Sequence, residues 1–494
     1  MCASGPGGGM LAAMFLNSSQ TVSCKSDFRV YIESHRTQDR DTGMRIKTDT
    51  DMTRGNIWLQ ILRFSVPMAL GLLFQQLYST VDALVVGQFV GKHALAAVGC
   101  NAPIINTIVG TFAGLATGAS VIISQSFGAH DDERLSRAVH TTMGVTFILC
   151  GLGTAIGLIA ARPLLNLTNT DPDVMDDALT YLRIYFAGVS GLLVYNMGTG
   201  ILRAVGDSTR PVYFLVISAV VNTVLDLVFV LVLKRGVDGV AYATIISQFI
   251  SAVMVLTVLM KTDRPYRFTL SGLRIHRDIL GRMLSLGLPT SVQSAVTAFS
   301  NVFVQAYINS LRADGMAGWT AYNRLDAFLV VPVMAIGMAS TTFVGQCWGA
   351  GLKERAREGV NKALTLCLCI TVFLSAMVMV FARPLLGIFV KAEETEVLEY
   401  GRFFVTVITP FYFTISFTQI YAGALRGIGN TAAPTVIMLS SFVVFRQIFL
   451  FIFTRVFPGD RLVIALAYPM GWVLCSALLV VFYRKSQLFA QGDQ

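Results

Sequence analysis

The chain has 494 residues, of which only 14% are charged and 54% are hydrophobic. A soluble protein carries about 25% charged residues, and the mean hydropathy of +0.64 excludes a soluble globular domain. The formal net charge is +9, but the basic residues lie in short segments between apolar runs, where orientation signals are expected. We therefore expect a lipid bilayer around the protein and no nucleic-acid partner.

The first 50 residues differ from the rest of the chain. They are rich in glycine and polar residues, and the apolar stretch Met10–Phe15 is too short for a signal-peptide core. We predict that residues 1–50 form a disordered cytoplasmic tail, or a non-native extension ahead of a start at Met44 or Met52.

Twelve apolar segments follow, each near the roughly 20 residues that cross a bilayer as a helix. They are predicted at residues 57–81, 95–125, 139–161, 176–201, 211–233, 239–260, 281–309, 317–345, 361–382, 397–424, 434–456 and 462–483. Glycine, proline and charged residues separate them. The predicted fold class is an all-α polytopic membrane protein.

The last six spans repeat the first six. The Gln-Ser-Phe-Gly of 125–128 returns 221 residues later as Gln-Cys-Trp-Gly at 346–349, and the Ala-Arg-Pro-Leu-Leu of 161–165 returns unchanged at 382–386. Duplicated membrane halves usually enclose a central substrate path, which indicates a transporter. We predict an N-lobe at 51–260, a cytoplasmic linker at 261–280, a C-lobe at 281–485 and a C-terminal tail at 486–494.

Basic residues concentrate in three loops that fall on one side of the predicted membrane, at 126–138, 261–282 and 350–362. By the positive-inside rule these loops and both termini are cytoplasmic. We expect a multi-pass protein of a plasma membrane, in a bacterium, that functions as a monomer.

Acids inside the membrane are expensive and therefore tend to be functional or paired. Asp82 ends the first span, and Asp226 lies one helical turn after Asn222 in the fifth. Asn196 in the fourth span and Thr244 in the sixth add neutral oxygen groups. Two carboxylates in one dry pocket cannot both ionise cheaply, so one of them is expected to carry a proton.

The same oxygen groups are also suitable for a hard cation, so Asp82, Asp226 and Asn222 are alternatively a Na⁺ site. The structural alternative is that Asp82 caps a helix end and Asp226 merely bonds to Asn222. Pro67 removes a backbone hydrogen bond in the middle of the first span and predicts a kink there, either static or used for bending.

A substrate cavity between the halves is the expected place for polar, aromatic and methionine side chains that repack around varied apolar cations. The candidates are Gln75, Tyr78, Met197, Phe299, Met334 and Arg446. Arg446 lies deep in the eleventh span and needs an acceptor, so it either pairs with a neighbour or lines the cavity. Arg324 and Asp326, two residues apart in the eighth span, are interpreted as partners of other helices.

No motif of an enzyme or of a nucleotide-driven pump is found. Residues 87–93 have three residues between their glycines, where a phosphate-binding loop needs four, and the Ser or Thr expected after the lysine is absent. The cysteines show no metal-ligand spacing. We predict no enzymatic activity and no cofactor besides a coupling ion.

Several of these segments together resemble a known family. They are Phe-Ser-Val-Pro at 64–67, Leu-Tyr-Ser-Thr-Val-Asp at 77–82, Ala-Leu-Ala-Ala-Val-Gly at 94–99, Leu-Arg-x-x-Gly at 202–206 and 425–429, and Gly-Val-Asp-Gly-Val-Ala-Tyr-Ala-Thr at 236–244. The combination resembles the multidrug and toxic compound extrusion (MATE) family over residues 51–485.

The resemblance implies two pseudo-symmetric six-helix bundles in a V. It also implies export of cationic amphipathic compounds in exchange for H⁺ or Na⁺. It assigns Asp82, Asn222, Asp226 and Thr244 to a coupling site in the N-lobe, with Asn196 as a less secure match. Acidic residues that other members place on the seventh and tenth helices are not matched here, which favours the N-lobe.

Two other functions compete with drug export. A lipid-linked oligosaccharide flippase has the same general architecture, but would need several arginines in its cavity, and only Arg446 is a convincing candidate. A membrane enzyme or receptor would need a nucleophile with its base, or a partner domain, and the sequence offers neither.

Overall fold

The computed structural model describes residues 50–168, 170–390 and 393–486. These residues belong to a unit that extends from Thr48 to Gln494, and the part described is helical with no β-strand. The prediction for the first 50 residues falls almost entirely outside the described residues.

The first half contains seven α-helices and two short π-helices, which are wider turns inserted into a helix. They are α2 (Ile57–Val85), η1 (Val86–Val90), α3 (Lys92–Gly128), α4 (Asp132–Leu167), α5 (Pro172–Ala187), α6 (Val189–Ala204), α7 (Thr209–Leu227), η2 (Val228–Val232) and α8 (Val237–Lys261). The segment that joins the halves contains only the 3₁₀ turn η3 (Leu270–Gly272).

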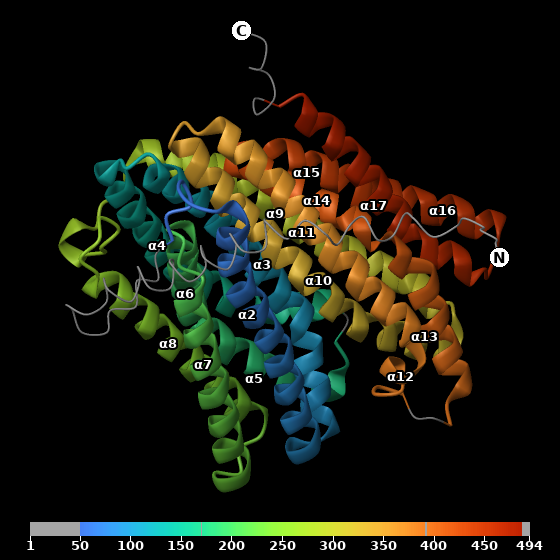
Figure 1. Cartoon of the computed structure of the whole chain (residues 1–494). Helices are drawn as coiled ribbons and strands as arrows, with labels where there is room; N and C mark the ends of the chain where they lie inside the picture. The colour runs from blue at the N-terminus through green and yellow to red at the C-terminus, as the bar shows by residue number, and fades with distance from the viewer. Residues whose placement is uncertain (1–49, 169, 391–392, 487–494) are drawn as a thin grey trace, which may run out of the picture. The chain divides into compact units, whose positions relative to one another are not determined.

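The second half follows the same order. It consists of α9 (Arg277–Asn309), α10 (Arg312–Gly349), α11 (Lys353–Val380), α12 (Ala382–Leu386), α13 (Thr395–Ile408), η4 (Thr409–Phe411), α14 (Tyr412–Gly427), α15 (Ala432–Leu439), η5 (Ser440–Phe445), α16 (Arg446–Val456) and α17 (Arg461–Arg484). Figure 1 shows the two sets of helices in their colour order along the chain.

The helices account for all twelve predicted spans, although they differ in character. In the described residues, 10 helices are long and apolar enough to cross a membrane, and the pair α5 and α6, bent by 49°, makes up to 11. The twelfth segment is α9, which is long enough but contains Arg277, Asp278 and Arg282 and several Ser, Thr, Gln and Asn residues. One face of α9 packs against α3, whereas apolar side chains such as Leu288 (55% exposed) and Val302 (61% exposed) lie on its surface.

The bend in the fourth span lies at Gly188, between α5 and α6. A Cβ atom there would lie 2.4 Å from the side chain of Ile245 on α8, which no larger residue can accept without a shift. The corresponding segment of the second half, Thr395–Gly427, is long and apolar enough to cross a membrane as a single span. The repeat in sequence therefore does not produce identical helix geometry.

Small residues allow the two halves to approach closely along α3 and α9. A Cβ atom on Gly114 would lie 2.3 Å from the backbone nitrogen of Ser291, and one on Gly118 would lie 2.5 Å from the carbonyl oxygen of Met283. The Ser291 hydroxyl donates to the carbonyl of Thr111 across this interface at 2.6 Å. Close backbone approach through small residues is the usual way in which membrane helices pack.

The repeated Gln-x-x-Gly segments meet each other at the ends of α3 and α10. The Nε2 of Gln125 donates to the carbonyl of Gly427 at 2.8 Å, and the Nε2 of Gln346 donates to the carbonyl of Ala204 at 3.0 Å. Gly427 and Ala204 occupy equivalent places in the two Leu-Arg-x-x-Gly segments. We call this reciprocal arrangement the paired-glutamine contact.

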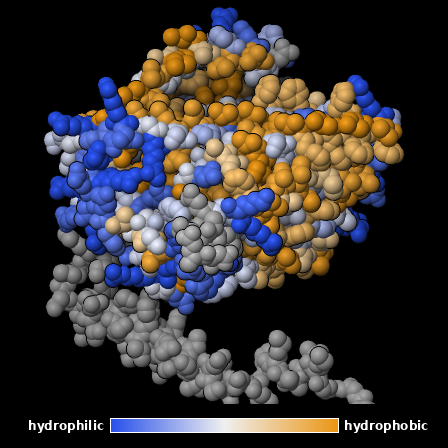
Figure 2. Space-filling view, turned by 90° about the horizontal axis from the view of Figure 1, so that it is seen from above, coloured by the Kyte–Doolittle hydropathy of each residue, from blue (hydrophilic) through white to orange (hydrophobic). Residues whose placement is uncertain are grey.

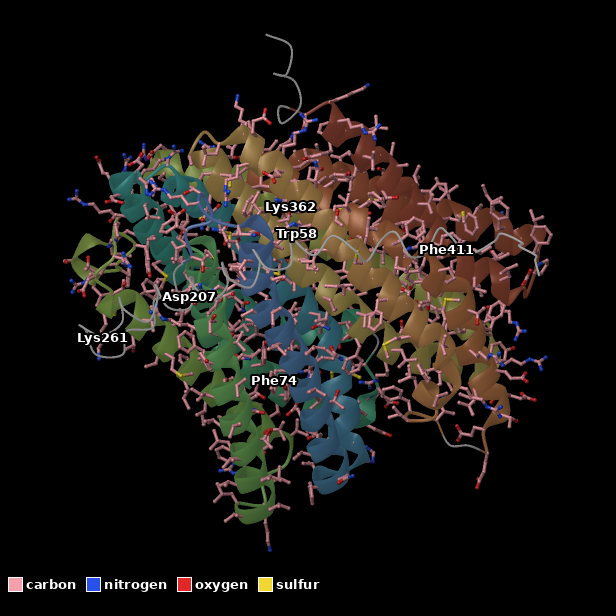
Figure 3. All side chains as sticks on the ribbon, viewed as in Figure 1. Trp58, Phe74, Asp207, Lys261, Lys362 and Phe411 are labelled. Carbon is pink, nitrogen blue, oxygen red and sulfur yellow. The ribbon has the colours of Figure 1, made fainter. Side chains whose placement is uncertain are left out.

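The halves are close at the paired-glutamine contact and diverge away from it. In Figure 1, α2, α5 and α7 run toward the bottom of the view, whereas α12, α13 and α16 run toward the right. In Figure 3, Lys261, the last residue of α8, lies at the left of the view, and Lys362, in the first part of α11, lies in the upper centre.

The surface has the hydropathy of a membrane protein. Seen from above in Figure 2, hydrophilic residues gather on one side and hydrophobic residues cover most of the remaining face. Large apolar side chains such as Ile159 (80% exposed) and Val380 (76% exposed) would be unfavourable in water over so wide an area. The structure therefore requires a bilayer around it.

Candidate functional site

Asp82 on α2 and Asp226 on α7 face each other in the first half. Their carboxyl groups lie within hydrogen-bonding distance of each other. Asp226 is 1% exposed, and Asp82 is partly buried. The structure thus brings together the two acids that the sequence singled out, although Asp82 lies inside α2 and not at its end.

Both acids are followed closely by a π-helix. Four residues after Asp82 the helix widens into η1, and two residues after Asp226 it widens into η2; η1 and η2 contact each other. π-helical turns are rare and are found frequently at functional sites. The sequence pattern gave no indication of either turn.

Helix α5 adds two tyrosines that sequence analysis missed, and each lies beside a polar residue of the neighbouring helix α8. Tyr181 is within hydrogen-bonding reach of Thr244, and Tyr185 is within reach of Gln248. Both tyrosines are 4% exposed. The available signal was two tyrosines one helical turn apart in an otherwise apolar segment, which is equally typical of a core helix.

Thr244 lies beside Tyr181, and Tyr181 in turn lies near the two acids. The hydroxyl of Thr244 donates to the carbonyl of Val240 at 3.0 Å, so it is oriented to accept a hydrogen bond from Tyr181. Tyr181 lies near enough to Asp82 and Asp226 to interact with both electrostatically. The arrangement is a buried acid pair with neutral oxygen groups around it.

The two candidate asparagines have different surroundings. Asn222 is 1% exposed and lies on the same face of α7 as Asp226. The amide of Asn196 on α6 donates to the carbonyl of Leu192 on its own helix at 2.9 Å. No described contact joins Asn196 to the acids.

The other first-half candidates are spread along α2 and α6. α2 continues through Pro67 as one helix, and Gln75 is exposed on it. Met197 on α6 is 2% exposed, so in this conformation it is packed in the interior. The side chain of Tyr78 lies outside the described residues.

In the second half, Arg446 is buried between helices. Its Nη2 donates to Ser300 Oγ at 3.1 Å and to Asn301 Oδ1 at 2.8 Å on α9, and its guanidinium lies 4.9 Å from the ring centroid of Tyr468 on α17. These contacts supply the acceptors that a buried guanidinium group needs. They also join α16, α9 and α17. Phe299, next to Ser300, is 65% exposed.

The remaining second-half candidates lie on α10. Asp326 accepts a hydrogen bond from Tyr322 at 3.3 Å, and the Tyr322 hydroxyl lies 3.1 Å from that of Tyr412 on α14. Arg324 is exposed, and Met334 is 44% exposed. The partner of Asp326 is thus on its own helix, and the link to another helix passes through the tyrosines.

The comparisons with known proteins agree with this architecture. A family model described as MatE matches residues 67–228 and again 289–452, one match in each half. The chain is 30% identical over 435 residues to the probable multidrug resistance protein YpnP of Bacillus subtilis, covering 88% of this chain and 96% of that protein. It is 26% identical over 439 residues to the probable multidrug resistance protein YoeA of the same organism, covering 87% and 94%.

A solved structure described as the outward-facing conformation of a multidrug resistance MATE family transporter of the MOP superfamily has the same fold. It superimposes with a TM-score of 0.82 at 26% identity and covers 90% of this chain and 98% of its own. The family predicted from the sequence is confirmed. The chain belongs to the MatE family, and it is a multi-pass membrane transporter and not an enzyme.

Proposed function

We propose that this protein exports cationic amphipathic compounds, drugs among them, in exchange for H⁺ or Na⁺. The relatives named above carry multidrug resistance in their names, which supports the substrate class. The observation that carries the proposal is the contact between Asp82 and Asp226 inside membrane-spanning helices. Two acids held this close inside the membrane cannot both stay ionised on their own. Either one of them takes up a proton, or a cation binds between them.

The coupling ion in this proposal binds at the acid pair. Oδ1 of Asp82 is buried and has no hydrogen-bond partner among the described residues, so it is open to a proton or to a metal cation. Na⁺ would add the amide oxygen of Asn222 and the hydroxyl of Thr244 as ligands, since hard cations prefer oxygen. The described residues contain no group of three His, Cys, Asp or Glu suited to a metal ion.

Export requires the central path to open alternately to each side of the membrane. In this conformation the paired-glutamine contact joins the halves at the ends that carry the basic loops. Under the positive-inside rule that side is cytoplasmic, so the path would be open outward. One chain supplies both halves, which supports a functional monomer.

The test is ethidium efflux from proteoliposomes under an imposed pH gradient and, separately, an imposed Na⁺ gradient. Efflux is expected under one gradient. It should fall about tenfold or more in Asp82→Asn and in Asp226→Asn, because typical coupling between two ligands is worth about 5- to 150-fold. The gradient that drives efflux identifies the ion.

The matched control is Asp238→Asn, which alters an acid paired with Arg235 at 2.9 Å at the beginning of α8. It should transport at the wild-type rate. Wild-type exchange in both Asp82→Asn and Asp226→Asn would place the coupling site elsewhere. Efflux under neither gradient would contradict drug export and would favour a flippase.

A further inference from the structure

A polar cavity of about 340 Å³ lies where the two halves meet, between the beginnings of α4 and α9. The loops around it are those that the positive-inside rule assigns to the cytoplasm. Its lining is Asp131, Glu133, Arg134 and Arg137 from the first half and Asp278, Ile279 and Arg282 from the second. The site is separate from the acid pair, and the transport proposal does not use it.

One of the three arginines is already neutralised. The Nη2 of Arg137 donates to both carboxylate oxygens of Asp278, at 3.1 and 3.0 Å. This ion pair joins α4 to α9, and so joins the halves beside the cavity. Arg137 and Asp278 are therefore part of its wall.

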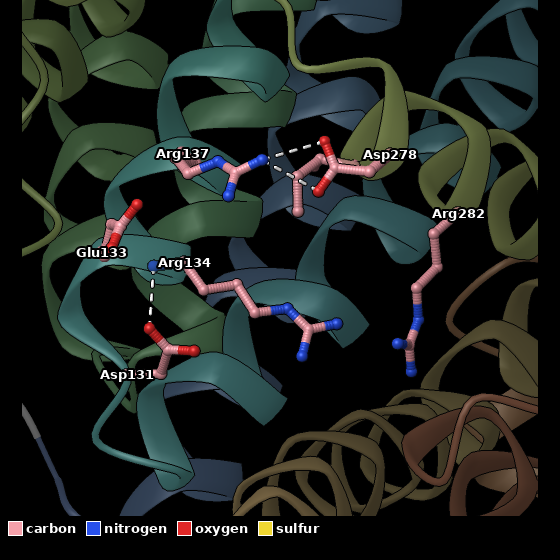
Figure 4. A pocket seen from close by; sticks show the side chains of 7 residues that line it. Asp131, Glu133, Arg134, Arg137, Asp278 and Arg282 are labelled. Atoms are coloured by element: carbon pink, nitrogen blue, oxygen red, sulfur yellow. Dashed lines mark hydrogen bonds and ion pairs between the residues drawn. The ribbon is translucent and has the colours of Figure 1, made fainter.

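The other two arginines face the cavity without a carboxylate. Among the described residues, neither Arg134 nor Arg282 forms an ion pair, and Arg282 donates only to the neutral amide oxygen of Gln125, at 3.0 Å. Figure 4 shows the two guanidinium groups reaching into the gap from opposite sides. Two positive charges are thus held facing each other across a space large enough for a small anion.

The acids in the lining do not fill this space. The carboxylate of Asp131 accepts a hydrogen bond from the backbone nitrogen of Arg134 at 2.9 Å and caps α4. Glu133 lies on the opposite side of Arg134 from Arg282 (Figure 4). The position between Arg134 and Arg282 therefore remains positive.

We propose that this cavity binds a phosphate-type anion between the guanidinium groups of Arg134 and Arg282, one from each half. The planar guanidinium fork matches phosphate oxygens in bidentate geometry, and basic pockets between membrane helices on the cytoplasmic side bind lipid headgroups. An anionic phospholipid headgroup and a soluble phosphate share this chemistry.

Binding here affects the conformation of the transporter, a consequence that rests on the proposed function. The anion would bridge the halves, and Arg282 also holds Gln125 of the paired-glutamine contact. A ligand that binds only when the halves are together stabilises that arrangement. The anion would therefore favour the conformation closed at this end.

The test measures thermal unfolding of the full chain, so its result does not depend on transport. One arm compares nanodiscs of phosphatidylcholine with nanodiscs that also contain phosphatidylglycerol. The other adds inorganic phosphate to phosphatidylcholine nanodiscs. A rise in melting temperature is expected in at least one arm, and the arm identifies the source of the anion.

Arg134→Gln should weaken the anion effect about tenfold or more, as expected when a charge-assisted hydrogen-bond donor is lost. The side chain of Arg134 makes no hydrogen bond to the described residues, so the variant is expected to fold; Arg134→Lys, which keeps the charge without the fork, is the second variant. Arg235→Gln, whose arginine is paired with Asp238, is the control for general effects of membrane charge. No rise in either arm, or an equal rise in wild type and Arg134→Gln, would overturn the proposal.

Discussion

Asp82 and Asp226 acquire their properties from the residues that surround them. Tyr181 has no distinguishing feature in the sequence, yet α5 places it beside Thr244 and near both carboxylates. Under the proposed function, its hydroxyl would orient Thr244, an oxygen group available to the coupling ion.

We expect Tyr181→Phe to retain the fold and to raise the ion concentration needed for half-maximal efflux. The loss of one neutral hydrogen bond is worth about 1 kcal/mol, or roughly a fivefold change. Efflux measured over a range of pH or Na⁺ concentration gives the ion concentration for half-maximal efflux in each variant.

Tyr185→Phe removes a hydroxyl from the same helix, but that hydroxyl lies beside Gln248 and not beside Thr244. It is the matched control and should stay near the wild-type ion dependence. An equal shift in both variants would indicate a general effect on α5 and not a role of Tyr181 at the ion site.

At the scale of helices, the ends of α3 and α10 determine how the halves meet. The acceptor oxygen of Gln346 receives the backbone N–H of Met52 at 2.9 Å, whereas that of Gln125 receives the side chain of Arg282. The bonds donated by the two amide nitrogens thus follow the internal repeat. The groups that donate to the two amide oxygens differ between the halves. The glycines Gly128 and Gly349 make the backbone contact possible.

Gly128→Ala is expected to weaken the paired-glutamine contact. Its Cβ atom would lie 1.9 Å from the carbonyl oxygen of Gln346, and overpacking of this kind costs about 1–3 kcal/mol. Cys347, which is 0% exposed beside this contact, should then react with a maleimide about tenfold faster in a variant that keeps it as its only cysteine.

Gly99→Ala on the same helix is the control, because a Cβ atom there has no neighbour within 4 Å. It should leave the labelling rate of Cys347 unchanged. Labelling of Gly128→Ala at the wild-type rate would show that the contact tolerates the extra atom.

For the whole molecule, the proposed alternating-access cycle would change the close contact between α3 and α9. Near its middle, a Cβ atom on Gly110 would lie 3.2 Å from the Cβ of Ser294. Disulfides have Cβ separations of about 3.5–4.5 Å, so a small relaxation would allow a bond between the halves.

The double variant Gly110→Cys with Ser294→Cys is expected to transport when reduced and to lose most efflux when oxidised. Dithiothreitol should restore it. The two single variants should be insensitive to oxidant. Full efflux from the oxidised, cross-linked protein would mean that the halves need not separate here.

The sequence alone determined much of the architecture. Apolar runs of bilayer length predicted the spans, because backbone groups in lipid must be satisfied within a helix. The repeat around Gln125 and Gln346 predicted two matched halves. The sequence also singled out Asp82 and Asp226, because charged residues are rare in apolar membrane helices.

The tertiary structure decided what periodicity cannot encode. The partners of Tyr181, of Arg446 and of both repeated glutamines lie on helices distant in sequence, so only packing selects them. At the bend in the fourth span, Ile245 of another helix lies so close that only glycine fits at position 188. Arg134 and Arg282 appear in the sequence as ordinary basic residues of cytoplasmic loops, and they form a site only because the halves come together there.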